Sequence, residues 1–199
     1  MATVGNTTTP ASNFFFYGVN VQNAAWSSYT MPAGGGLITQ LNGFFDLDTG
    51  GPSTCFLCVW DSSGNLLASA SVASVPAGSQ SSGGQAWHSA NLATPLFVAG
   101  GTLINIGWWV PQANGMVATT ESTGTTFSGT QAGSPGTASG PAVSSVGALG
   151  SYATYTPGNV WVWNGSAWVA GSLPSVWNGS AQVQGIPQVW NGSSWVLGS

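Results

Sequence analysis

The sequence predicts an all-β protein: a jelly-roll-like β-sandwich followed by a short C-terminal array of β-hairpin repeats. The 199 residues include 30 Gly and 11 Pro, together with many Ser, Thr and Asn, which indicates short strands joined by tight turns. Hydrophobic residues make up 43% and aromatic residues 12%, so the chain can bury a core, unlike a disordered chain. A short tryptophan-containing motif recurs near the C-terminus, and no stretch combines a helical period with capping residues.

Residues 1–155 are predicted to form the sandwich. Its expected strands are Asn13–Val21, Leu37–Leu47, Cys55–Trp60, Leu66–Val72, Gln85–Leu92, Leu96–Val98 and Thr102–Val110. Their regular spacing, with turn residues between them, favours a sandwich or jelly roll. The Gly- and Ser-rich segment 121–150 is expected to be a long loop, and a final strand is expected within 143–155.

Residues 156–199 contain the repeats. Val162–Val169 reads VWNGSAWV and recurs as Val176–Val183 and Val189–Val196, with spacings of 14 and then 13 residues. Asn-Gly between apolar residues is a strong hairpin signal because both residues tolerate positive φ. Each repeat is therefore predicted to be a small hairpin. Its turn residues are expected to be Asn164, Gly165, Asn178, Gly179, Asn191 and Gly192.

Six of the 11 tryptophans lie in these repeats, and an isolated hairpin is only marginally stable in water. The repeat tryptophans must therefore be buried against another surface. Self-association, most simply as a homotrimer, is the expected arrangement. The expected interface residues are Trp161, Trp163, Trp168, Trp177, Trp190 and Trp195.

Charge excludes several classes of function. The chain has no Lys or Arg, only four acidic residues and a net charge of −4. Nucleic-acid binding and attraction to an anionic membrane need cations, as do enzymes that hold anionic substrates through Arg or Lys. No run of 18 apolar residues predicts a transmembrane helix, and no secretory signal is visible. A chain without Lys or Arg has no salt bridges and no trypsin sites, which suits a harsh exterior, yet it shows no export signal. A protein made in a host cytoplasm and carried outside on a particle such as a virion would reconcile these two facts.

The pair Cys55 and Cys58 has the spacing of a redox or zinc motif. Residues i and i+3 of a strand point to opposite faces, so the sulfurs are expected to diverge and to be buried. With no further Cys and a single histidine, His88, one chain cannot supply four zinc ligands of these types. No metal site and no cofactor is therefore predicted from this motif.

The acidic residues suggest little chemistry. Asp46 and Asp48 are considered as ligands of a weakly bound Ca²⁺, although turn formation is the preferred interpretation. The remaining acids are Asp61 and Glu121, and no sequence resembles a nucleophile elbow. We therefore expect a protein that is not an enzyme.

Aromatic side chains on a charge-poor surface suit neutral glycans. The candidates for stacking on a sugar ring are Trp26, Trp87, Trp108 and Trp109, although burial in a core or interface is the favoured interpretation. The neighbours Trp108 and Trp109 must face opposite sides of their strand.

The tandem VWNGSAWV copies over Val160–Ser199 resemble the C-terminal repeats of minor tail and other virion proteins from tailed phages of actinobacteria. Gln182 replaces the second Trp in the middle copy, and the Lys and Arg usual between the repeats are missing. Residues Gly35–Val110 more loosely resemble jelly-roll modules of phage appendages.

The resemblance implies a virion structural protein, most simply a minor tail or fibre-like component in contact with other virion proteins. The sandwich would be displayed, with a host cell-surface glycan as an additional partner. A capsid decoration or head-fibre protein is one alternative, and a free lectin-like carbohydrate-binding module is another.

Overall fold

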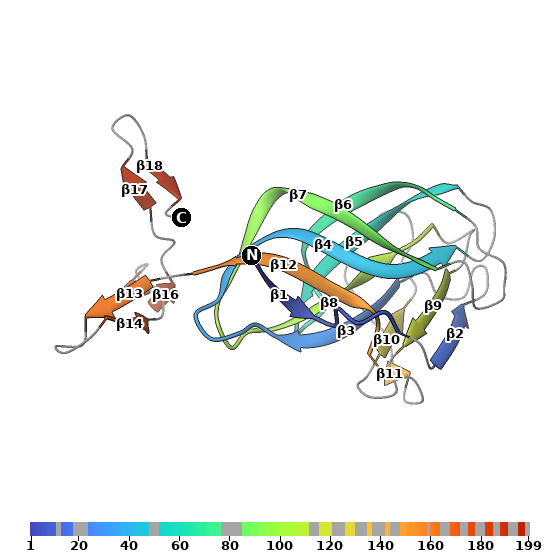
Figure 1. Ribbon diagram of the computed structural model, residues 1–199, viewed down its shortest axis with the longest axis horizontal. Coiled ribbons are helices and arrows are strands. Elements are labelled where there is room, and N and C mark those ends of the chain that lie inside the picture. The colour runs from blue at the N-terminus through green and yellow to red at the C-terminus, as the bar shows by residue number, and fades with distance from the viewer. Residues whose placement is uncertain are drawn as a thin grey trace.

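The computed structural model describes residues 1–10, 24–47, 52–76, 85–111, 135–136 and 148–158 with their side chains. It also gives the backbone of strands at 13–17, 116–120, 126–129, 142–143, 160–163, 168–171, 175–177, 182–184, 188–190 and 195–197. All the regular elements in the described part of the chain are strands (Figure 1). The predicted all-β class is confirmed, and the main body is a sandwich of two antiparallel sheets.

The first sheet, called sheet A, is centred on one long strand. It contains β1 (Ala2–Gly5), β2 (Asn13–Tyr17), β4 (Gly36–Leu47), β7 (Ala86–Val98), β9 (Met116–Thr120) and β12 (Ser151–Pro157). Strand β7 pairs along one side of β4, and strands β12 and β9 follow one another along its other side. Strand β1 then pairs with β12, and β2 with β9. Sheet A thus brings together strands from the start of the chain, from its middle and from residues near 155.

The second sheet, called sheet B, has the order β11-β10-β3-β8-β5-β6. Its strands are β3 (Ala24–Thr30), β5 (Ser53–Asp61), β6 (Leu66–Val75), β8 (Leu103–Trp109), β10 (Thr126–Gly129) and β11 (Ala142–Val143). The β5–β6 hairpin turns at Asp61, whose carboxylate accepts hydrogen bonds from the backbone N–H groups of Ser63 and Asn65. Gly64 supplies the positive φ that this turn requires.

The main core lies between the sheets. Leu41 and Phe45 of β4 meet Leu57 of β5 and Trp108 of β8, and all four side chains are fully buried. The rings of Phe45 and Trp108 stack with their centroids 4.8 Å apart. Alternation along the strands explains this core, because every second side chain faces the opposite sheet.

A second cluster lies on the outer face of sheet B. It consists of Ala24, Trp26, Cys58, Trp60 and Trp109, all of them buried. The indole Nε1 of Trp60 donates a hydrogen bond of 2.7 Å to the backbone carbonyl of Gly136. Residue 136 belongs to the segment expected to be a long loop, so part of that segment contacts the outer face of sheet B.

The observed strands differ from the predicted ones in both halves of the sandwich, because β1, β3, β9 and β10 are not among the expected strands. Strand β7 is continuous where two strands were expected, and its register slips between the pairs Ile38–Leu96 and Gln40–Asn91. The slip leaves residues 92–95 out of register, and it includes Pro95, which cannot donate a ladder hydrogen bond. Strand β10 lies inside the expected loop, and its sequence TFSG has almost no alternating pattern from which a strand could be predicted.

Three separate two-stranded sheets follow β12 along the chain (orange to red in Figure 1). They pair β13 (Val160–Trp163) with β14 (Trp168–Gly171), β15 (Ser175–Trp177) with β16 (Gln182–Gln184), and β17 (Gln188–Trp190) with β18 (Trp195–Leu197). Each repeat places Val opposite Val and ends its ladder at a Trp position, so the three backbone registers are equivalent.

Candidate binding surfaces

Burial separates the four tryptophans considered for glycan stacking. Trp108 is fully buried between the sheets, while Trp26 and Trp109 are 4% and 5% exposed in the outer cluster of sheet B. The adjacent Trp108 and Trp109 do face opposite sides of β8, as the alternation predicts. A buried indole has no face to offer a sugar, so these three residues are core residues and not glycan contacts. Trp87 is left.

Trp87 lies on the outer face of sheet A, on strand β7, and is half-buried. Its ring contacts Phe44 of β4 and Tyr152 of β12, with centroid distances of 5.4 Å and 5.3 Å. Its indole Nε1 donates a hydrogen bond of 3.0 Å to Thr9 Oγ1. These contacts with Phe44, Tyr152 and Thr9 hold the ring in one orientation before any ligand binds, which lowers the entropic cost of binding.

Uncharged polar side chains continue this face along the same strands. Ser89 of β7 donates to Asn42 Oδ1 on β4, and Asn42 Nδ2 donates to Thr154 Oγ1 on β12 at 3.4 Å. One row further, Gln40 Nε2 donates to Asn91 Oδ1 at 3.1 Å. The cross-strand pairs Phe44–Trp87, Asn42–Ser89 and Gln40–Asn91 therefore form three successive rows, spanning about 13 Å at the rise of a strand.

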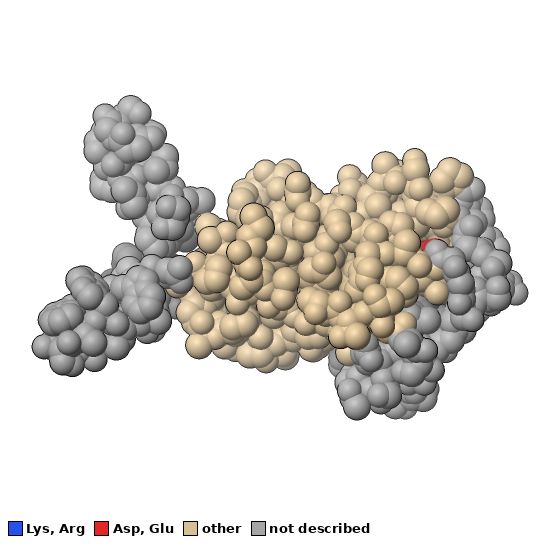
Figure 2. Space-filling model, viewed as in Figure 1, with Lys and Arg blue, Asp and Glu red and all other residues tan. Residues whose placement is uncertain are grey.

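The described surface carries almost no charge. Figure 2 shows one face of the molecule with no basic atoms and only a trace of acidic atoms among the described residues. Asp61 is a partly exposed acid at the turn of the β5–β6 hairpin, where hydrogen bonds from Asn65 lower the pKa of its carboxyl. Asp46, on β4, is fully buried. A ligand of the outer face of sheet A would thus meet amides, hydroxyls and aromatic rings.

The residues considered for catalysis or metal binding do not come together in the described part of the chain. No group of three or more His, Cys, Asp or Glu side chains gathers there. Asp48 and Glu121 lie outside the described residues, so the Asp46–Asp48 calcium pair is not described. His88 Nε2 lies 3.0 Å from the carbonyl oxygen of Phe45, which can only accept, so Nε2 carries the proton. Burial lowers the pKa of His88, and this hydrogen bond opposes the shift.

The two cysteines are buried on opposite faces of β5, as the strand alternation predicted. Cys55 belongs to the main core and Cys58 to the outer cluster of sheet B, and both are free thiols. Burial raises the pKa of Cys55 to about 12 and also raises the pKa of Cys58. A thiol that stays protonated is a poor nucleophile and a poor metal ligand, so both act as core residues.

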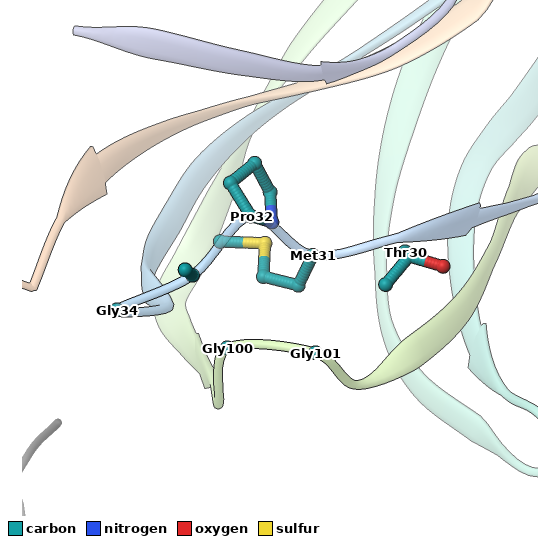
Figure 3. Close-up of a pocket in the computed structure, with 7 residues that line it drawn as sticks. Thr30, Met31, Pro32, Gly34, Gly100 and Gly101 are labelled. Atoms are coloured by element: carbon teal, nitrogen blue, oxygen red, sulfur yellow. The ribbon is translucent and has the colours of Figure 1, made fainter.

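A hollow of about 610 Å³ lies at one end of the sandwich (Figure 3). It is lined by Thr30, Met31, Pro32, Ala33, Gly34, Gly100 and Gly101. Its two turns are tied together because Met31 N–H donates to the Thr102 carbonyl and Gly101 N–H donates to the Met31 carbonyl, both at 2.8 Å. The lining has no titratable side chain, so the hollow offers shape and backbone groups rather than acid–base chemistry.

The hollow adjoins the point where the chain leaves the sandwich for the repeats. Gly158 N–H donates a hydrogen bond of 3.0 Å to the carbonyl of Gly35, in the turn that follows the hollow's lining residues. A Cβ on Gly158 would come within 2.9 Å of the Gly34 carbonyl oxygen, so only glycine fits without a shift. The start of the repeat segment is therefore anchored to the sandwich by backbone contacts.

The predicted residues of the repeats are described only in part. Trp161, Trp163, Trp168, Trp177, Trp190 and Trp195 lie in strands given by backbone alone, and their side chains are outside the described residues. The predicted turn residues Asn164, Gly165, Asn178, Gly179, Asn191 and Gly192 also lie outside the described residues. Their roles in turns and in an interface stay predictions.

Within the described residues, the chain has no helix of the length and apolarity needed to cross a membrane. Compared with family models, with curated proteins and with solved structures, the chain matches none.

Proposed function

We propose that this chain is a non-enzymatic structural protein of a phage particle, a minor tail or fibre-like component. In this proposal, the jelly-roll-like sandwich is displayed on the exterior of the virion. The repeats associate chains as a homotrimer and contact other virion proteins. The observation that carries the proposal is the tryptophan-rich repeat array, because among the described residues each repeat forms a two-stranded sheet without a third strand.

The repeats need a partner for a physical reason. A two-stranded pair of three or four residues per strand has too little buried surface to be stable alone. The repeats hold six Trp, which is the residue type with the largest burial gain, and no charged residue. Joining such pairs from several chains would produce a dry, apolar interface without any salt bridge. The anchored Gly158 would give each chain the same starting point for that assembly.

Light scattering tests the proposal on the full chain. We expect a fixed oligomer, most simply a trimer, whose mass falls to that of the 20.0 kDa monomer when Trp163, Trp177 and Trp190 are changed to Ala. A chain ending at Gly158 should also be monomeric, at its own smaller mass, because the strands of sheets A and B precede that point. The matched control carries Ser166→Ala, Ser180→Ala and Ser193→Ala in the same repeats and should keep the oligomeric mass.

Two results would contradict this proposal. An unchanged oligomeric mass in the Trp variant would show that the repeats do not hold the chains together. A monomer in the unaltered chain, combined with binding to a sugar, would favour the lectin-like module over assembly.

A further inference from the structure

We infer that the outer face of sheet A is a binding site for a neutral hexose polysaccharide. Trp87 and the side-chain amides of Gln40 and Asn91 would contact the sugar. The inference deepens the proposed function, on which it rests only for the idea that the sandwich is displayed and meets a cell surface. It concerns strands β4, β7 and β12, none of which belongs to the two-stranded sheets of the repeats.

The aromatic end of this face has the properties of a sugar-stacking platform. A sugar ring presents a row of C–H groups that pack on the face of an indole, and such contacts need a ring that is exposed and held still. Among the described tryptophans, Trp87 is the one outside both buried clusters. Phe44, Tyr152 and Thr9 fix its orientation through two ring contacts and one hydrogen bond.

The polar end of the face supplies directional hydrogen bonds. Asn91 is exposed and Gln40 partly exposed, and their mutual bond uses only one N–H and one oxygen. Each amide carries two donors and one acceptor oxygen, so Asn91 Nδ2 and Gln40 Oε1 can bond a sugar hydroxyl without breaking that pair. Ser89 is exposed in the row between them and Trp87. Amides and hydroxyls beside an aromatic ring are the groups that recognise sugars.

Charge selects the class of polysaccharide. The chain contains no Lys or Arg, so a uronic acid or phosphate group would find no cation to pair with. A neutral polymer has no anionic group that would need a cation, so this face can bind it without one. A second copy of the chain fits less well as the occupant, because two such faces would bring rows of amides and hydroxyls together where stable interfaces place an apolar core.

Affinity electrophoresis under native conditions tests the inference. With a net charge of −4 at pH 7, the full chain migrates towards the anode. Gels containing mannan, galactan or dextran should slow that migration in at least one case, and a gel containing the anionic polymer alginate should not slow it by specific binding. Trp87→Ala should raise the apparent Kd about tenfold. Asn91→Ala, an exposed change that leaves the aromatic cluster intact, should raise it about fivefold.

Leu67→Ala is the matched control, because Leu67 is 42% exposed on β6 of the other sheet and its truncation should leave binding unchanged. Migration unaffected by all three neutral polymers overturns the inference, as does equal retardation of the parent chain and both variants. Equal binding to alginate overturns the selection for neutral sugars. A lower oligomeric mass for Asn91→Ala would assign the face to a contact between copies and also overturn it.

The same gels separate this inference from the proposed function. The Trp163, Trp177 and Trp190 variant should lose its oligomeric mass and still be slowed by the polysaccharide. Loss of mass without retardation in any chain would leave assembly standing and remove the sugar site. If the unaltered chain is monomeric and is still slowed by the polysaccharide, the sugar site stands and the assembly proposal fails.

Discussion

The two outer faces of the sandwich use the same residue type in opposite ways. Sheet B places Trp26, Trp60 and Trp109 outward, and all three are buried, with Trp60 hydrogen-bonded to Gly136. Sheet A places Trp87 outward and leaves it half-buried beside exposed amides and hydroxyls. An outward-facing tryptophan therefore belongs to a second core on sheet B and is a candidate sugar contact on sheet A. What differs is whether another part of the chain lies over it.

The largest effect should come from the covered face. Trp60→Ala removes a fully buried indole and its hydrogen bond, so the free energy of unfolding should fall by about 3–5 kcal/mol. Urea unfolding followed by circular dichroism measures this loss. Trp60→Phe keeps a ring and removes the N–H donor, and it should cost clearly less. A loss below about 1 kcal/mol for Trp60→Ala would mean that sheet B has no second core.

The same change on the open face should cost less. Trp87→Ala removes a half-buried ring with neighbours on two strands, so we expect a loss of about 1–2 kcal/mol in the same urea experiment. The result is compared directly with Trp60→Ala. Equal losses for the two variants would show that both faces are covered to the same extent, which would end the distinction between them.

The neighbour of Trp87 on β7 gives a pH test. His88 is the only histidine, and the chain has no Lys or Arg, so few other groups titrate between pH 5 and 8. Burial lowers the pKa of folded His88 below 6.5, so the unfolded chain takes up a proton first as pH falls. Stability should be complete above pH 6.5 and decline below it, with a slope of at most about 1.4 kcal/mol per pH unit, down to the lowered pKa. His88→Gln should flatten this slope in urea titrations at pH 5, 6 and 7, and a slope that persists unchanged would assign it to another group.

The smallest effect concerns the edge strand β6 of sheet B. Ser74 is exposed and has a φ of 57°, a left-handed conformation that costs a non-glycine residue about 1 kcal/mol. Ser74→Gly should therefore raise the free energy of unfolding by about 0.5 kcal/mol after the added entropy of glycine is subtracted. The matched control is Ala73→Gly, one residue earlier, which should lower stability by about 0.5–1 kcal/mol. Calorimetry of both variants gives the sign, and a loss for Ser74→Gly would contradict the strain.

Much of the fold follows from local pattern. The expected strands Cys55–Trp60 and Leu66–Val72, with turn residues between them, form the β5–β6 hairpin. The opposite facing of Cys55 and Cys58 follows from the two-residue period alone. Strand β10 and the slip in β7 could not be predicted in this way. Each depends on a partner strand far away in the sequence, β3 for one and β4 for the other.

For the candidate site, too, one part could be predicted from the sequence and another part could not. Composition alone determined that any ligand of this chain is recognised without cations, and it identified tryptophan as the main aromatic group. Local pattern could place a tryptophan on one face of a strand, but it could not say which face is covered. That was decided by the tertiary structure, through contacts such as Trp60 with Gly136 and Trp87 with Thr9, whose members are 76 and 78 residues apart. Burial is a property of how distant segments pack, and a short window of sequence contains only one side of each contact.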